Sequence, residues 1–207
     1  MNPVNVTVTN HVDTLPEEIA LGVMQDRIAA CQMKEYVPNP GFPLFEETML
    51  FLVRLAHHYK PKTIIDGGSG VSSMILRKYV PDAHIISIDL DRGWLETTKR
   101  LCDKFEVNPS GEFTTWDKFL FKNTSTYPFI VHDMGNMLVR KSTMIPMLSL
   151  AAPDAILLVD DLGCKDFKPY ALGQILRSRF VPIYPTNPEL LDNKEAGRFG
   201  SFKRGNP

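Results

Sequence analysis

The sequence predicts an α/β fold in which helices cover both faces of a doubly wound, mostly parallel sheet. Two observations lead to this prediction. Helical and strand patterns alternate along most of the 207 residues, with no internal repeat and no low-complexity linker. The runs Phe129–His132 and Ala155–Val159 are continuously apolar, which is typical of strands that a parallel sheet buries on both faces.

The N-terminal part predicts a helix followed by a loop. Pro16 precedes two acids, which favours a helix start there, and four apolar residues share the expected buried face. These four are Ala20, Met24, Ile28 and Cys31. The segment 36–43 contains three prolines and a glycine, so we expect a loop. We expect residues 1–44 to form a helix and a lid beside a globular unit, 45–207, whose first helix spans 45–59.

A glycine turn follows the first expected strand, 63–66, directly after Asp66. The turn contains Gly67, Gly68 and Gly70, and a helix over 72–79 would direct its free N–H groups toward a ligand above the turn. The next strand, 84–88, ends at Asp89. A strand, a glycine turn, a helix and a second strand ending in an acid form a pocket for an adenosine ribose. The sequence therefore predicts a cofactor that contains a nucleoside.

The later elements continue the alternation until the C-terminus. We expect a helix over 94–105, a short strand over 112–115 and a helical stretch over 140–150, where Pro146 predicts a kink or break. Two strand-like segments, 180–184 and 198–202, then follow with no helix pattern between them. Pro182 restricts the first of these to an edge or bulge position.

The turn itself favours one cofactor class over another. A dinucleotide fingerprint has glycine or alanine where this chain has Ser73. A carboxylate at Asp66 would repel a pyrophosphate, whereas it would attract an ammonium group. S-adenosylmethionine carries an ammonium and a sulfonium and no phosphate, so it suits this turn.

The order acid-x-Gly-x-Gly, followed by an acid at the end of the second strand, resembles the class I S-adenosylmethionine-dependent methyltransferases. The resemblance covers the chain from about Phe45 onward, and the block Asp66–Ser72 is its most specific part. It implies a seven-stranded sheet that ends in an antiparallel hairpin, and the two C-terminal strand-like segments agree with such a hairpin.

The resemblance also implies site residues. Asp66 and the turn would hold the methionine part of the cofactor, Asp89 would accept both ribose hydroxyls, and Leu90 would lie against the adenine. Asp117 would accept from the adenine amine, although an acid at the start of a short helix explains it almost as well. The full expected cofactor set is Asp66, Gly67, Gly68, Ser69, Gly70, Ser72, Asp89, Leu90, Trp116, Asp117 and Asp133.

Three carboxylates form a second group. Asp133 follows one central strand, and Asp160 and Asp161 follow the next. Three carboxylates with no thiol or imidazole nearby suit a hard divalent ion such as Mg²⁺, Ca²⁺ or Mn²⁺. It resembles the catechol-type, metal-dependent O-methyltransferases, but Asp161 stands where that group has an amide. The alternative, that Asp133 lines the pocket and the pair caps the next helix, stays open.

A base is harder to place, because Asn136 stands where the catechol-type group has a catalytic lysine. Asp133, His132 and Lys165 are the candidates, and Lys168 is an alternative to Lys165. His132 is equally well explained as a hydrogen-bonded core residue, because strand alternation can direct it away from the side of Asp133.

Composition and charge exclude several classes. The net charge of −1 and the absence of an Asn/Asp-Pro-Pro-aromatic motif after the fourth strand argue against nucleic-acid substrates. No apolar run reaches the roughly 20 residues of a membrane span. Three isolated cysteines suit a cytoplasmic protein with reduced thiols. We therefore expect a small-molecule acceptor, and a homodimer stays open. The rival classes are a nicotinamide-dependent oxidoreductase and a non-methylating relative that keeps the cofactor site.

Overall fold

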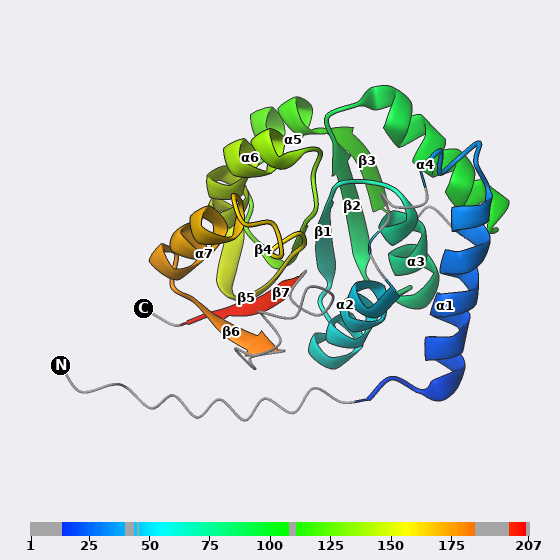
Figure 1. Cartoon of the computed structure of the whole chain (residues 1–207), viewed down its shortest axis with the longest axis horizontal. Coiled ribbons are helices and arrows are strands. Elements are labelled where there is room, and N and C mark those ends of the chain that lie inside the picture. The colour runs from blue at the N-terminus through cyan, green and yellow to red at the C-terminus, as the bar shows by residue number, and fades with distance from the viewer. Residues whose placement is uncertain (1–13, 40–43, 45, 108–110, 185–198, 206–207) are drawn as a thin grey trace.

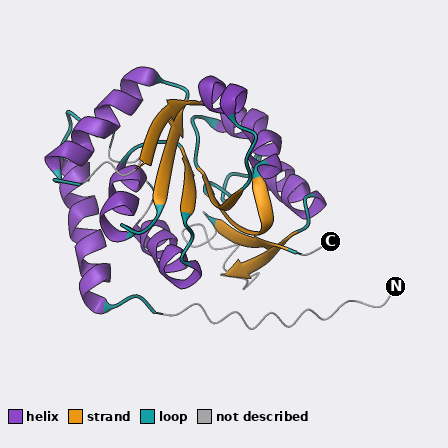
Figure 2. Cartoon of the chain, turned by 180° about the vertical axis from the view of Figure 1, so that it is seen from behind, coloured by secondary structure: helices purple, strands orange, loops and turns teal. Residues whose placement is uncertain are grey.

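The structure is a computed structural model that describes residues 14–39, 44, 46–107, 111–184 and 199–205. In these residues a seven-stranded sheet lies between two layers of helices (Figure 1), and the view from behind shows the same layering (Figure 2). The strands are β1 (Thr63–Gly67), β2 (His84–Asp89), β3 (Gly111–Thr115), β4 (Tyr127–His132), β5 (Ala151–Val159), β6 (Phe180–Tyr184) and β7 (Gly200–Arg204).

The strand order confirms the predicted sheet. The order is β3-β2-β1-β4-β5-β7-β6, in which the first five strands are parallel and β7 runs antiparallel to both β5 and β6. Pro182 lies on the edge strand β6, where a residue without an N–H group is tolerated. The chain moves outward from β1 to β3 and then returns to β4 on the other side of β1. This reversal opens a crevice at the carboxyl ends of β1 and β4, where ligands of open α/β sheets bind.

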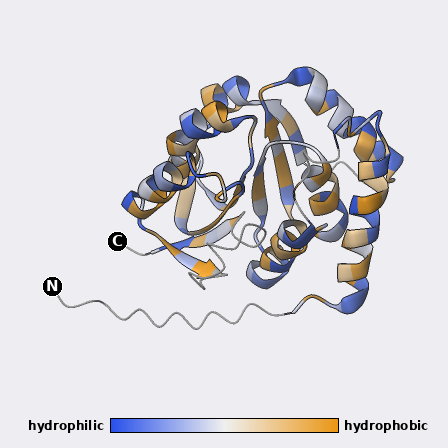
Figure 3. Ribbon diagram, viewed as in Figure 1, coloured by the Kyte–Doolittle hydropathy of each residue, from blue (hydrophilic) through white to orange (hydrophobic). Residues whose placement is uncertain are grey.

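Alternation along the strands separates the core into two halves. The helices are α1 (Glu17–Gln32), α2 (Glu46–Tyr59), α3 (Val71–Tyr79), α4 (Arg92–Lys104), α5 (Trp116–Lys122), α6 (Met137–Ser149) and α7 (Lys168–Arg177). Ile64 and Ile85 face the layer of α1 to α4, whereas their neighbours Ile65 and Ile86 face the layer of α5 to α7. Figure 3 shows apolar residues along the central strands.

Two expectations about helices need correction. The buried residues of α1 are Val23 and Ala30, while Ile28 from the expected stripe is 46% exposed. Helix α1 packs on α2 and α3 rather than on the sheet, so the strong apolar stripe of a sheet-covering helix is not required. Helix α6 continues through Pro146, so the break that was one of the two expected outcomes does not occur.

The lid expected over the N-terminal part falls only partly within the described residues. Its residues 1–13 and 40–43 lie outside them. Met49, on α2, is fully buried in the core. Among the described residues, no helix combines the length and the apolar character that crossing a membrane requires.

Candidate active site

The glycine turn after β1 lies directly against the end of β4. Gly68 has a φ of +102°, and a Cβ at this position would collide with the backbone of Asp133. The N–H of Gly68 donates to the carbonyl of Ile88 at 2.9 Å, and the N–H of Asp133 donates to the carbonyl of Gly67 at 2.7 Å. The turn therefore connects the ends of β1, β2 and β4, and only glycine fits at 68.

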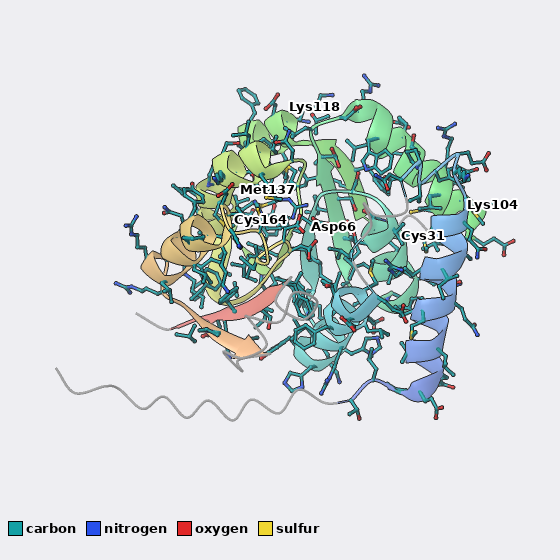
Figure 4. All side chains as sticks on the ribbon, in the orientation of Figure 1. Cys31, Asp66, Lys104, Lys118, Met137 and Cys164 are labelled. Atoms are coloured by element: carbon teal, nitrogen blue, oxygen red, sulfur yellow. The ribbon has the colours of Figure 1, made fainter. Side chains whose placement is uncertain are left out.

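Asp66, which Figure 4 labels, lies on β1 just before this turn. It is only 1% exposed. Its carboxylate accepts hydrogen bonds from the hydroxyls of Ser72 at 3.1 Å, Ser87 at 3.1 Å and Ser73. Burial raises the pKa of Asp66, against the opposing effects of Ser73 and the charge of Arg77. This placement corrects our expectation that the side chain meets the ligand: Asp66 supports the turn from inside the protein.

A buried arginine completes the network below the turn. Arg77 on α3 is 3% exposed and donates to the Ser87 hydroxyl at 2.7 Å. It also donates to the carbonyls of Ser73, Ile85 and Glu112, and its guanidinium lies 4.1 Å from the centre of the Phe113 ring. Sequence reasoning missed Arg77, because a charged residue in a helix pattern ordinarily indicates a solvent-exposed position.

Asp89 is held at the end of β2 by four donors. The N–H and the hydroxyl of Ser69 donate to Oδ2 at 3.0 and 3.2 Å, and the N–H groups of Leu90 and Asp91 donate to Oδ1 at 2.7 and 3.2 Å. Burial raises the pKa of Asp89, and these hydrogen bonds oppose that effect. Both oxygens are thus fixed in place beside the glycine turn.

A cavity of about 400 Å³ opens above the turn and includes Asp89. Its floor is formed by Gly68, Ser69, Gly70, Val71 and Ser72. The end of β4 and the start of α6 contribute Asp133, Gly135, Asn136 and Arg140 to its lining. Its apolar lining is formed by Tyr36, Val37, Leu44, Trp94 and Leu101, and Thr98 also lines it. The cavity therefore combines a bare glycine backbone, a carboxylate acceptor and an apolar surface, as small-molecule sites do.

Trp94 is a second residue that sequence reasoning missed. Its indole N–H donates to the carbonyl of Ser69 at 2.6 Å, which fixes the ring over the turn. At Gly70, the atoms nearest to the place of a Cβ belong to Trp94, at 3.9 Å, so the backbone there is open to the cavity. Trp94 begins the expected helix pattern, but nothing in the sequence distinguishes a pocket residue from a core residue at that position.

The three carboxylates at the ends of β4 and β5 do come together, as the strand pattern predicts. One oxygen each of Asp133, Asp160 and Asp161 lies within 4.8 Å of the others. The guanidinium of Arg140 forms ion pairs with Asp133 and, at 2.9 Å, with Asp161. Burial and the Asp160 carboxylate raise the pKa of Asp133, and Arg140 opposes them. The cation that this cluster requires is therefore supplied by α6.

His132 contacts α6 through Thr143 and does not line the cavity, which corrects its proposed role as a base. It is fully buried, and Nε2 lies 3.0 Å from the hydroxyl of Thr143. That hydroxyl donates to the carbonyl of Val139 at 2.8 Å, so it accepts from His132, which places the ring proton on Nε2. Burial lowers the pKa of His132 to about 3. The ring is a neutral core group at physiological pH.

The remaining expected site residues lie outside the cavity lining. Lys165 is exposed in the segment after β5, which does not support a role as base, and Lys168 begins α7. Leu90, Trp116 and Asp117 lie at the carboxyl ends of β2 and β3, next to Asp89. Leu90 is 45% exposed, whereas Trp116 is buried and packs against Phe119.

Comparison with solved structures identifies the fold. The O-methyltransferase TomG from Streptomyces achromogenes, solved with S-adenosylmethionine, superimposes with a TM-score of 0.57 at 15% identity, over 93% of this chain and 92% of that one. The chain has the class I methyltransferase fold. This confirms the fold that the sequence predicts.

Two further methyltransferases share the fold at similarly low identity. An O-methyltransferase from Bacillus cereus, solved with S-adenosylhomocysteine, matches with a TM-score of 0.56 at 12% identity, over 92% of each chain. The methyltransferase PaMTH1 from Podospora anserina, also with S-adenosylhomocysteine, matches with a TM-score of 0.58 at 13% identity, over 95% of this chain and 91% of that one. No protein-family model and no curated protein sequence matches the chain.

Proposed function

We propose that this chain transfers a methyl group from S-adenosylmethionine to a small acceptor, at oxygen. The observation that carries the proposal is Asp89, whose two oxygens are held beside an exposed glycine backbone on a cavity of about 400 Å³. Solved structures with this fold include O-methyltransferases that hold S-adenosylmethionine or S-adenosylhomocysteine.

The residues of the cavity fit such a cofactor. The backbone of Gly68 and Gly70 would receive the methionine part, with Ser69 and Ser72 beside it, and Asp89 would accept from the ribose hydroxyls. Gly67 would contribute through packing, because a Cβ there would lie 2.9 Å from the backbone carbonyl oxygen of Val131. The adenine would lie toward Leu90, Trp116 and Asp117.

In this proposal the protein contributes orientation, exclusion of water and a proton acceptor. Bound S-adenosylmethionine supplies a methyl group that its sulfonium already activates. The acceptor oxygen would form a bond to the methyl carbon as the carbon–sulfur bond breaks, and the electron pair of that bond stays on sulfur. Asp133 lines the cavity and has a raised pKa, which suits a carboxylate that takes up the acceptor's proton.

The C-terminal hairpin, rather than Asp66, now argues against a nicotinamide cofactor. Asp66 is buried among three serine hydroxyls, so its repulsion of a pyrophosphate no longer decides the matter. The antiparallel hairpin of β6 and β7 distinguishes this chain from dinucleotide-binding proteins, because dinucleotide folds usually end in a further helix and a parallel strand. Thermal shift with S-adenosylhomocysteine and with NAD separates the two cofactors.

A divalent ion is not part of this mechanism. The three carboxylates that we expected to bind Mg²⁺ already have an arginine among them, and an added ion would meet its positive charge. We derive no step from a metal.

We further propose a covering segment for the cavity, a location for the chain and the partners that it meets. Tyr36, Val37 and Leu44 line the cavity, which supports a covering role for the segment 1–44. Cys31, Cys102 and Cys164 are free, which supports a cytoplasmic location with reduced thiols. We also propose that the methyl acceptor is not a nucleic acid and that the chain forms a homodimer.

The proposal is tested by mass spectrometry on the purified chain, followed by a transfer assay with labelled S-adenosylmethionine and a panel of small hydroxyl compounds. Co-purified S-adenosylmethionine or S-adenosylhomocysteine and a labelled product support methyl transfer. Cofactor binding without any product, across acceptors with oxygen, nitrogen and carbon nucleophiles, favours the non-methylating alternative.

A further inference from the structure

The acidic cluster at the carboxyl ends of β4 and β5 is arranged around a side chain from α6. Asp160 is 3% exposed, and the side chains of Asp133 and Asp161 are 12% and 20% exposed. Three carboxylates this close together in a partly buried place repel one another, so the fold requires a positive charge among them.

Arg140 is placed in the cluster by the way α6 begins. Asn136 caps the helix by accepting from the N–H groups of Leu138 and Val139 at 3.0 and 3.2 Å. Arg140 follows one turn later, and its own N–H donates to the carbonyl of Asn136 at 2.9 Å. The Nε–H donates to the carbonyl of Gly135 at 3.2 Å, which fixes the side chain against the loop.

The guanidinium contacts two of the three acids. Its Nη2 pairs with Oδ1 of Asp133, and its Nη1 lies 2.9 Å from Oδ2 of Asp161. The side chain is 9% exposed and lines the cavity beside Asp133. A guanidinium stays charged across the physiological range and offers planar donors that match carboxylates.

We infer that Arg140 takes the place of a divalent cation in this site and positions Asp133 for the reaction. A hard cation bound by these three carboxylates would lie close to the fixed positive charge of Arg140. The wild-type cluster therefore binds no divalent ion, and removal of the guanidinium exposes a binding site for one. The positioning role rests on the proposed methyl transfer, whereas the metal-binding behaviour does not.

The test uses Mn²⁺ as the probe and the full chain as the protein. The six-line electron paramagnetic resonance signal of free Mn²⁺ loses amplitude when the ion binds, so it reports binding without turnover. The variants are Arg140→Ala, Arg140→Lys and the double variant Arg140→Ala with Asp160→Asn. Lys141→Ala is the matched control, because it removes one positive charge from the next position of the same helix and the cavity lining does not include it.

We expect wild type, Arg140→Lys and Lys141→Ala to leave the signal unchanged. We expect Arg140→Ala to reduce the signal at Mn²⁺ concentrations at least about tenfold below the highest concentration at which wild type shows no binding. Added Mn²⁺ should also raise the melting temperature of that variant, because a ligand that binds only the folded state stabilises it. The double variant should lose both effects.

Tight Mn²⁺ binding by wild type, or no binding by folded Arg140→Ala, would overturn the inference. If Arg140→Ala does not fold alone, refolding in Mn²⁺ decides: recovery supports the inference and failure contradicts it. Calorimetry with S-adenosylhomocysteine on the wild type tests the cofactor site separately. For the positioning role, Arg140→Lys should retain turnover with a shifted pH profile, and a profile identical to wild type would contradict it.

Discussion

Ser69 donates both its backbone N–H and its hydroxyl to one carboxylate oxygen, Oδ2 of Asp89, at 3.0 and 3.2 Å. These two bonds join the glycine turn after β1 to the acid at the end of β2. The two halves of the sequence motif are therefore joined directly, and the hydrogen bonds orient the Asp89 carboxylate. Such preorganisation lowers the entropy that binding has to offset.

Replacement of Asp66 by asparagine should weaken the fold more than the cofactor site. The carboxylate accepts from three serine hydroxyls and shares the Ser87 hydroxyl with the buried Arg77, so an amide would place a donor against donors. We expect a loss of about 2–4 kcal/mol in the free energy of unfolding by denaturant titration. Asp103→Asn, at an exposed position on α4, should change it by less than about 0.5 kcal/mol. Unchanged stability with weakened S-adenosylhomocysteine binding would return Asp66 to the ligand site.

Gly68→Ala should disrupt the turn. It combines a φ of +102° with a Cβ that would enter the backbone of Asp133, so the crevice between β1 and β4 has to open. We expect reduced stability and lost cofactor binding. Gly173→Ala is the matched control: it lies inside α7 with nothing within 4 Å of its Cβ position, so alanine should stabilise by about 0.5–1 kcal/mol. Equal melting temperatures for the two variants would contradict the role given to Gly68.

His132→Gln should change how stability depends on pH. Burial lowers the pKa of His132 to about 3, against 6.5 for an exposed histidine. As pH falls, His132 therefore takes up its proton at a higher pH in the unfolded chain than in the folded one. The free energy of unfolding of the wild type then decreases between pH 6.5 and 3, by on the order of 1 kcal/mol per pH unit. The raised pKa values of Asp66, Asp89 and Asp133 act with the opposite sign, so the difference between wild type and variant isolates the histidine.

That difference is measured by denaturant titration of both proteins at pH 8, 7, 6 and 5. The variant should be less stable at pH 8, because a flexible amide replaces the buried ring that stacks on Phe167, and the gap in stability should narrow as pH falls. A constant gap across this range would contradict the assignment of a neutral, buried ring.

The sequence allowed the sheet and the acids at its carboxyl edge to be predicted because each acid ends an apolar run. Asp66, Asp89 and Asp133 each follow such a run, and parallel strands bring their carboxyl ends to the same edge of the sheet. The alternation of burial then follows from the two-residue period of a strand.

The partners of those acids could not be predicted in the same way. Arg77 and Arg140 both lie in helices, where a charged residue ordinarily faces solvent, and both are buried only because the fold brings carboxylates and carbonyls to them. The buried face of α1 was predicted wrongly, because this helix packs on α2 and α3 instead of the sheet. The ring of Tyr79 on α3, for example, lies close to Gly22.

The proposal depends above all on cofactor binding at Asp89, which isothermal titration calorimetry with S-adenosylhomocysteine measures. Wild type should bind with a dissociation constant on the order of micromolar, near −8 kcal/mol. Asp89→Ala should weaken binding more than tenfold, because each hydrogen bond to a charged group contributes about 1.5–3 kcal/mol. Asp82→Ala, an exposed acid just before β2 at the opposite edge of the sheet, should bind like wild type. No binding by wild type, or equal binding by a folded Asp89→Ala variant, would contradict the proposed site.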